Sequence, residues 1–224
     1  MSYLVRVILP DTPGSLGGLA EAFGVVEANI QSVDIVETTR IDGKPVVTDD
    51  IVVELPTGAM VDSLITAAAS IGGVEIDSIR PYSGRVDRRE QIQMLAGIAA
   101  RSGNLSNTLD ELVGVIPSAV TSSWAVVLRN ADSVMERVAA SSAAPEDDGS
   151  RPPKCATESA CVLDPETDDW APRSWFQLDT ALTITPLHGK DLVLVVGRLG
   201  GPDFLASEVT QIGDLGCIVG AMLS

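Results

Sequence analysis

The chain has 224 residues, of which 45% are hydrophobic and only 4% aromatic. This length accommodates one large domain or two small ones, each with a core of its own. The formal net charge of −16 repels phosphate backbones and anionic lipid head groups. We therefore expect no nucleic-acid partner and no role at a membrane surface.

The termini and the cysteines indicate a cytoplasmic protein. No basic residues lead into an apolar run at the start of the chain, so the sequence predicts no signal peptide. The apolar stretch 212–223 is too short and too interrupted by glycine to span a bilayer. Three cysteines are an odd number and do not indicate a disulfide framework, so we expect a reduced environment.

The first eighty residues alternate between strand and helix patterns. Helical spacing of apolar residues predicts helices, and β-rich runs between turn residues predict strands. The expected elements are a strand at 4–9, a helix at 15–26, strands at 29–39 and 46–55, a helix at 60–71 and a strand at 74–80. The third strand could also begin only after Asp50. This β-α-β-β-α-β order is typical of the ferredoxin-like fold, with both helices on one face of an antiparallel sheet.

The rest of the chain predicts a second domain of mixed helix and sheet. We interpret the polar, turn-rich residues 83–90 as a linker between a domain at 1–82 and a domain at 91–224. The fold class expected for the whole chain is α+β. The elements expected in the second domain are helices at 91–101 and 105–116, a strand at 123–129, a helix or helical turn at 131–140, an irregular acidic loop at 141–173, strands at 174–185 and 192–197, and a helix at 206–223.

Two short segments of the first domain suit ligand binding. Residues 11–16 read Asp-Thr-Pro-Gly-Ser-Leu between the first strand and the first helix, and residues 28–30 read Ala-Asn-Ile at the start of the second strand. Gly14 lets backbone N–H groups approach a carboxylate at a helix N-terminus. Asn29 can pair with the amino or carboxyl group of a ligand.

These two segments, with their spacing and the element order, resemble the ACT family of amino-acid-binding regulatory domains over residues 3–82. The resemblance implies a ligand site where the loop of one copy meets the second-strand start of another, so that dimerisation completes it. The contacts it implies are Asp11, Gly14, Ser15, Leu16, Asn29 and Ile30. The sequence departs from the family in having Ala28 where a glycine often precedes the Asn-Ile pair. The alternative interpretation is a strand-to-helix turn that binds nothing.

The second half resembles a reduced GAF-type sensor module. The resemblance depends on the order of elements, from two leading helices to a Gly-Pro-Asp-Phe loop at 201–204 and a C-terminal helix. It implies a small molecule bound in a sheet pocket, or a dimerisation unit. A packed domain without a ligand is the alternative.

No catalytic or metal-binding constellation is predicted. His188, the single histidine, lies in a turn without a recognisable catalytic partner, and we expect it in solvent. Cys155 and Cys161 lack the ligand spacing of a zinc site, which leaves a reversible thiol pair as a speculative alternative. Cys217 is expected in the core. Asp49-Asp50 could bind a cation, but a solvated strand edge is the favoured interpretation.

The sequence therefore predicts a non-catalytic regulatory protein without cofactor or metal. It would bind an amino acid at an ACT-like interface in a homodimer or higher homo-oligomer, and pass the signal to its second domain or to a regulated protein partner. A structural or adaptor dimer with a vestigial ligand loop is the alternative. An enzyme with its active site in the second half is the weakest hypothesis.

Overall fold

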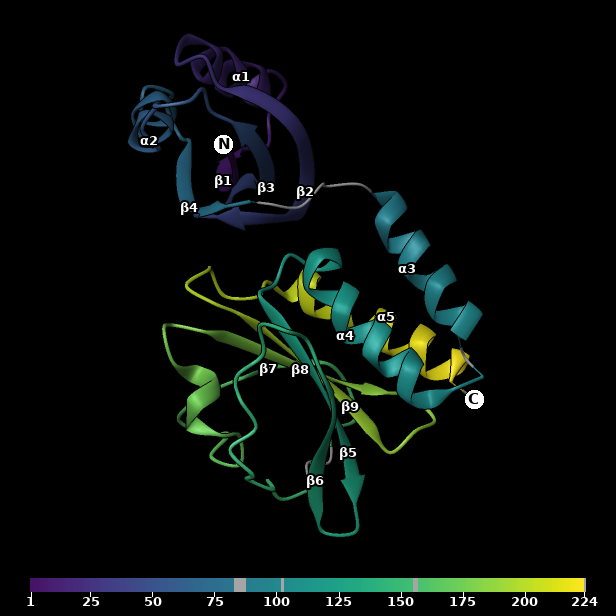
Figure 1. Cartoon of the computed structure of the whole chain (residues 1–224). Coiled ribbons are helices and arrows are strands. Elements are labelled where there is room, and N and C mark those ends of the chain that lie inside the picture. Colours follow the sequence, from purple (N-terminus) through teal and green to yellow (C-terminus); the bar gives the residue numbers. More distant parts are fainter. Residues whose placement is uncertain (83–87, 102, 155–156, 224) are drawn as a thin grey trace. The chain divides into compact units, whose positions relative to one another are not determined.

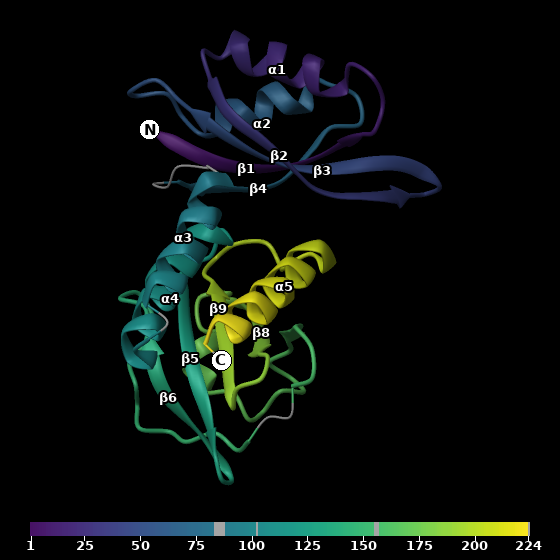
Figure 2. The same cartoon turned by 90° about the vertical axis from the view of Figure 1, so that its right-hand side faces the viewer.

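The computed structural model describes residues 1–82, 88–101, 103–154 and 157–223 (Figures 1 and 2). The chain divides into two compact units, Met1–Val86 and Asp87–Ser224, which are described separately. Most of the predicted linker, residues 83–87, lies outside the described residues, and the first helix of the second unit begins at Arg88. No helix in the described part of the chain is long and apolar enough to cross a membrane.

The first unit contains a four-stranded antiparallel sheet with two helices. Its elements are β1 (Ser2–Pro10), α1 (Ser15–Val25), β2 (Asn29–Ile41), β3 (Lys44–Glu54), α2 (Asp62–Ala69) and β4 (Glu75–Pro81). The strand order is β2-β3-β1-β4, and all neighbours are antiparallel. Both helices lie on the same face of the sheet (Figure 2). The β-α-β-β-α-β order predicted from the sequence is therefore present.

Alternation along the strands places the core between the sheet and the helices. Val5, Val7 and Leu9 of β1 pack with Leu19 and Phe23 of α1 in one buried cluster. Residues two apart on a strand share a face, so the side chains of these three β1 residues all point towards the helices.

The turn between β2 and β3 fixes the register of that hairpin. Asp42 and Gly43 have φ values of 51° and 77°, as a two-residue type I′ turn requires. Strand β3 starts directly after this turn, at Lys44. The alternative start after Asp50 is therefore wrong.

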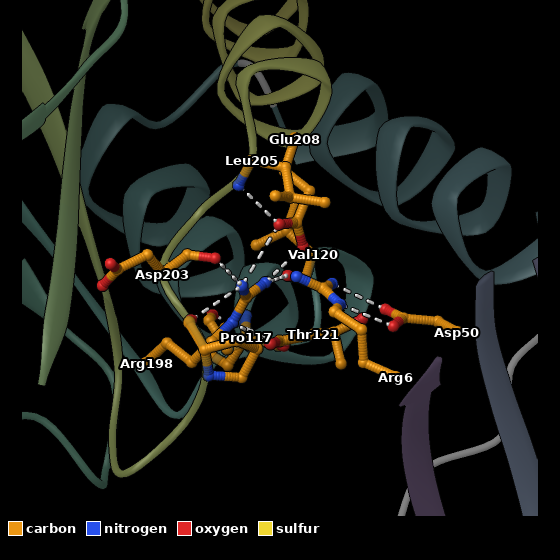
Figure 3. A network of polar contacts seen from close by, with 11 residues as sticks. Arg6, Asp50, Pro117, Val120, Thr121, Arg198, Asp203, Leu205 and Glu208 are labelled. Carbon is orange, nitrogen blue, oxygen red and sulfur yellow. Dashed lines mark hydrogen bonds and ion pairs between the residues drawn. The ribbon is translucent and has the colours of Figure 1, made fainter. Parts of the chain in front are cut away.

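A buried ion pair lies on the face of this sheet that points away from the helices. Arg6 of β1 and Asp50 of β3 are cross-strand neighbours, and only 2% of the Arg6 surface is exposed. Nε donates to Oδ1 and Nη2 donates to Oδ2, both at 2.8 Å (Figure 3). This two-pronged geometry neutralises Asp50 and leaves its sequence neighbour Asp49 on the other face.

The second unit contains a five-stranded antiparallel sheet with helices on one face. Its elements are α3 (Arg88–Arg101), α4 (Leu105–Ala119), β5 (Trp124–Ala131), β6 (Val134–Ala140), β7 (Cys161–Leu163), the 3-10 helix η1 (Arg173–Phe176), β8 (Ala181–Leu187), β9 (Leu192–Arg198) and α5 (Ala206–Met222). The strand order is β6-β5-β9-β8-β7. Ala171 and Trp175, which follow β7 in the chain, pack on the other side of the sheet. The segment that carries them is seen beside β7 in Figure 1.

Three predicted elements of this unit are wrong. The irregular loop expected at 141–173 contains the short strand β7 at Cys161–Leu163. Residues 131–140 were expected to be helical, but they form the end of β5 and the strand β6. A tight turn, with Asp132 at a φ of 43°, pairs Ala131 with Val134 and turns the chain back along β5. The strand expected at 174–185 is extended only from Ala181. Leu178 and Asp179 adopt positive φ values of 58° and 51°, which interrupts any strand before that point.

Both faces of the central strands are buried. Val127 and Val196 face the helices, whereas Val126 and Val195 face the opposite cluster. This double burial explains why β5 and β9 read as continuous apolar runs rather than as alternating ones.

The end of β9 is joined to the start of α5 through a completely buried arginine. The Arg198 guanidinium donates to Glu208 Oε1 at 2.6 Å and to the carbonyl of Thr121 at 3.1 Å (Figure 3). It also lies 4.0 Å from the centroid of the Phe204 ring. Glu208 Oε2 in turn accepts the backbone N–H of Leu205 at 2.9 Å. One ion pair therefore fixes the loop and the first turn of the last helix.

Glycines let α5 contact the sheet through its backbone. A Cβ atom at Gly216 would lie 2.6 Å from the carbonyl oxygen of Pro186, and one at Gly220 would lie 2.5 Å from the backbone nitrogen of His188. A side chain at either position would therefore push the helix off β8 and the following turn.

We expect Gly220→Ala to destabilise the second unit by about 1–3 kcal/mol, because the new methyl group overlaps the backbone of His188. The matched control is Gly114→Ala in α4, where a Cβ meets open space. That change should leave stability unchanged or raise it by up to about 1 kcal/mol. Urea unfolding of the two variants measures the difference, and equal midpoints would contradict the packing described.

We expect Glu208→Gln to cost about 3–5 kcal/mol, because it leaves the buried charge of Arg198 without a counter-charge. Asp214→Asn removes the same charge from an exposed position of the same helix and should change stability by less than about 0.5 kcal/mol. Thermal unfolding at neutral pH compares them. A small effect of Glu208→Gln would show that Arg198 is neutralised in another way.

Candidate functional site

The loop between β1 and α1 has a defined conformation. The backbone N–H of Asp11 donates to the carbonyl of Pro45 at 3.1 Å, which ties the loop to the start of β3. The hydroxyl groups of Thr12 and Ser15 are hydrogen-bonded to each other at 2.8 Å. Gly14 has a φ of 95°, a value that favours glycine, and it precedes the first residue of α1.

The start of α1 leaves backbone donors available. The N–H of Ser15 bonds to the Thr12 carbonyl and that of Gly18 to the Gly14 carbonyl. Within the described residues, no acceptor lies on the N–H groups of Leu16 and Gly17, and no side chain caps the helix. The first turn also carries no acidic residue. This exposed helix end therefore has a partial positive charge and suits an anionic group.

The six predicted contact residues fall into two groups. Asp11, Gly14, Ser15 and Leu16 lie together at this loop, whereas Asn29 and Ile30 do not. Pro10 pairs with Val46 of β3, while Asn29 pairs with Glu54, eight residues further along the same strand. At about 3.3 Å per residue, the two groups are about 26 Å apart in one copy of the chain. One copy therefore does not assemble the predicted site.

Asp49 is a residue that the sequence interpretation placed wrongly. It was expected with Asp50 on a solvated edge, but β3 is an inner strand and both aspartates are buried. Asp49 is only 3% exposed and pairs with Val7, on the side of the sheet that the helices cover. Its Oδ1 atom is buried without a hydrogen-bond partner.

The surroundings of Asp49 disfavour its charged form. Burial, followed by the negative charges of Asp50 and Asp11, raises the pKa of the Asp49 carboxyl above its ordinary value. The pattern of β3 could have revealed this position. Val47, Ile51 and Val53 share its face and pack in or against the core, so strict alternation places Asp49 among apolar residues.

The helix-free face of the second sheet is filled by side chains. The rings of Trp124 and Trp175 meet edge to face with centroids 6.0 Å apart, and Trp124 lies directly against Gly197. A small hollow at the margin is lined by Arg137 and by the acidic segment 146–148. Burial lowers the pKa of Arg137, whose guanidinium donates to the carbonyl of Pro145 at 2.7 Å.

The remaining polar candidates form no site within the described residues. His188 is exposed, as predicted. Cys161 is exposed on β7, and its suggested partner Cys155 lies outside the described residues. Cys217 is exposed, so its predicted place in the core is wrong. It follows Gly216 by about 100° of helix rotation, which turns it away from the sheet. No group of three metal-binding side chains occurs in the part of the chain that the structure describes.

Comparison with known proteins gives matches to solved structures only. No protein-family model matches the chain, and no curated protein does. The GAF domain of a phosphoenolpyruvate-protein phosphotransferase from Coxiella burnetii is 16% identical and has a TM-score of 0.47. The alignment covers 60% of this chain and 93% of that one.

Two further similar structures are also GAF domains. The domain from the Acinetobacter phosphoenolpyruvate-protein phosphotransferase is 14% identical, with a TM-score of 0.45 and coverage of 61% and 94% of the two chains. The A. aeolicus nlh2 GAF domain, in an inactive state, is 11% identical, with a TM-score of 0.43 and coverage of 60% and 96%.

We expect Asp49→Asn to stabilise the free protein at neutral pH. Because the folded-state pKa of Asp49 is raised, the folded state holds this proton more tightly than the unfolded state. Its contribution to stability therefore falls as pH rises from the ordinary aspartate value of 3.8 through the raised pKa. Asparagine cannot ionise, so the variant avoids this loss.

The expected gain in Tm at pH 7 is about 2–4 °C, the shift that about 1 kcal/mol causes in a chain of this size. The gain should vanish when the pH falls below 3.8, where aspartate is protonated in both states. Thermal unfolding across this pH range measures it. Asp42→Asn, in the exposed hairpin turn, is the control and should show no such trend. A pH-independent difference for Asp49→Asn would contradict the charge argument.

Proposed function

We propose that this chain is a non-catalytic regulatory protein that binds an amino acid between two ACT-like N-terminal units. Binding changes how two copies pack, and the change passes to the C-terminal unit or to a regulated protein partner. The loop between β1 and α1 is the ligand site in this proposal.

The observation that carries the proposal is the free start of α1. The N–H groups of Leu16 and Gly17 have no acceptor in the described structure, and Gly14 precedes them in a left-handed conformation that favours glycine. Such an arrangement favours a carboxylate, which accepts hydrogen bonds from backbone N–H groups at a helix N-terminus. Every amino acid carries this group.

A second copy is needed to bring Asn29 to the loop. Strand β2 is an edge of its sheet, and two such edges can pair antiparallel about a two-fold axis. The Asn29 end of one β2 then lies beside the Ile41 end of the other. Asp11 is hydrogen-bonded to Pro45 at that same end, so both groups of predicted contacts lie at one end of the joint sheet.

The exposed side chains of β2 support this pairing. Ile35 is 71% exposed and Ile41 is 48% exposed, although both lie in a strand. Covering them is favourable at about 25 cal/mol per Å² of apolar surface. The same observation favours the second candidate function, an adaptor dimer with a vestigial loop, because apolar edges pair without a ligand.

Thermal-shift measurements with the twenty amino acids separate the two functions. At a hundredfold excess over Kd, a bound amino acid stabilises the protein by about 2.7 kcal/mol, or about 5–10 °C in Tm. Gly14→Val, which cannot adopt the required φ, and Asn29→Ala should each abolish the shift. Gly114→Ala in α4, where a Cβ meets open space away from the proposed site, is the control that should retain it. No shift with any amino acid would favour the adaptor.

Mixing the two inactive variants tests whether the site is shared. A heterodimer of Gly14→Val with Asn29→Ala contains one intact site, made from the unmutated loop of one copy and the unmutated Asn29 of the other. Random exchange of copies should therefore restore about a quarter of the binding capacity. Calorimetric titration before and after mixing measures this recovery. No recovery, or a monomer by light scattering, would contradict an interface site.

A further inference from the structure

We propose that Asp49 accepts the ammonium group of the bound amino acid, while the N–H groups of Leu16 and Gly17 receive its carboxylate. This inference rests on the proposed function and deepens it, because it assigns the recognition of the amino group to a residue outside the six predicted contacts. Asp11, at the rim of the loop, supplies a second negative charge.

The register of the sheet places Asp49 on the face that the helices cover, one same-face row before β1 ends at the loop. Asp49 pairs with Val7, and the next row on the same face, Val47 with Leu9, is the last before β1 ends at Pro10. The chain then turns through Asp11 into α1, which packs on this face of the sheet. The charge of Asp11 acts on the Asp49 carboxyl, in agreement with this placement.

The hydrogen bonding of Asp49 indicates a missing cationic partner. Its Oδ1 atom is buried and accepts no hydrogen bond in the described structure, although its sequence neighbour Asp50 is fully paired with Arg6. A buried carboxylate is normally paired with a cation or a donor. The two charges that act on it, those of Asp50 and Asp11, are both negative and repel its charged form.

The two ends of the site have opposite electrostatic character. The start of α1 offers N–H donors and a partial positive charge, whereas Asp49 and Asp11 offer acceptors and negative charge. A primary ammonium group beside a carboxylate satisfies both ends, since it has three donors and a full positive charge. Inorganic phosphate satisfies only the helix end. A divalent metal ion lacks ligands, because no third metal-binding side chain joins these two within the described residues.

This arrangement makes the free protein less stable in order to favour the bound one. Unfavourable features of this kind cluster at binding and catalytic sites, where a bound state compensates for them. An ammonium group reaching Asp49 replaces the unfavourable burial with a charge-assisted hydrogen bond. Affinity should therefore depend on the amino group, and not only on the carboxylate.

Calorimetric titration of the full chain with matched probes tests this dependence. For each amino acid that stabilises the unmodified protein, the probes are the amino acid itself, the acid lacking its amine and the amine lacking its carboxylate. For alanine these are L-alanine, propionate and ethylamine. The proteins are the unmodified chain, Asp49→Asn and the control Asp42→Asn, which removes the same charge from an exposed turn.

We expect the unmodified chain and Asp42→Asn to bind the amino acid at least about tenfold more tightly than the acid lacking the amine, the change that about 1.4 kcal/mol produces. Asp49→Asn should lose this preference. Its affinity for the acid lacking the amine should stay unchanged, which would show that the carboxylate site at the start of α1 is intact. An undiminished preference in Asp49→Asn would overturn this inference and leave the proposed function standing. If no amino acid binds the unmodified chain, both are wrong.

Discussion

A charge can be buried in a protein only if a group of opposite charge or a set of hydrogen bonds lies beside it, and both units of this chain obey that constraint through an arginine. Arg6 is paired with Asp50 across two strands of the first sheet, and Arg198 with Glu208 between the last strand and the last helix of the second unit. In a chain with a net charge of −16, the arginine is the scarcer member of each pair. The first pair holds β1 and β3 in register, and the second holds the start of the last helix against the end of the last strand.

Asp49 departs from the same rule one residue away from Asp50. The alternation of β3 sends the two carboxylates to opposite faces, so the cation that neutralises one cannot reach the other. A feature of this kind lowers the stability of the empty protein, and proteins retain such features where they serve binding or catalysis. The proposed ammonium subsite follows from this contrast between neighbours, and not from the loop motif alone.

The predictability of the chain from its sequence followed the strength of the local signals. The first unit's element order was predictable because apolar spacing, the Asp42-Gly43 turn and the glycines all agreed. Strand β6 has a mixed local signal, because its two valines favour a strand whereas Glu136, Arg137 and the two alanines do not. Its pairing with β5 makes it extended. The alternation of apolar residues along β3 does indicate that Asp49 is buried. The separation of Asn29 from the loop depends on strand order, which no local pattern encodes. The apolar composition of α5 predicts Cys217 in the core, but only one face of this helix packs on the sheet and Cys217 lies on the exposed face.

The unpaired edge of β2 also bears on how far the protein can assemble. An edge strand of this length is a template on which further strands can add, the route to open-ended polymers. If two copies paired their β2 edges about a two-fold axis, the two sheets would form one sheet of eight strands. Its two edges would then be the β4 strands. Strand β4 is short, carries Asp77 and ends at Pro81, which lacks a backbone donor. Such an assembly would close at two copies, and its growth into fibres would be blocked by the composition of β4.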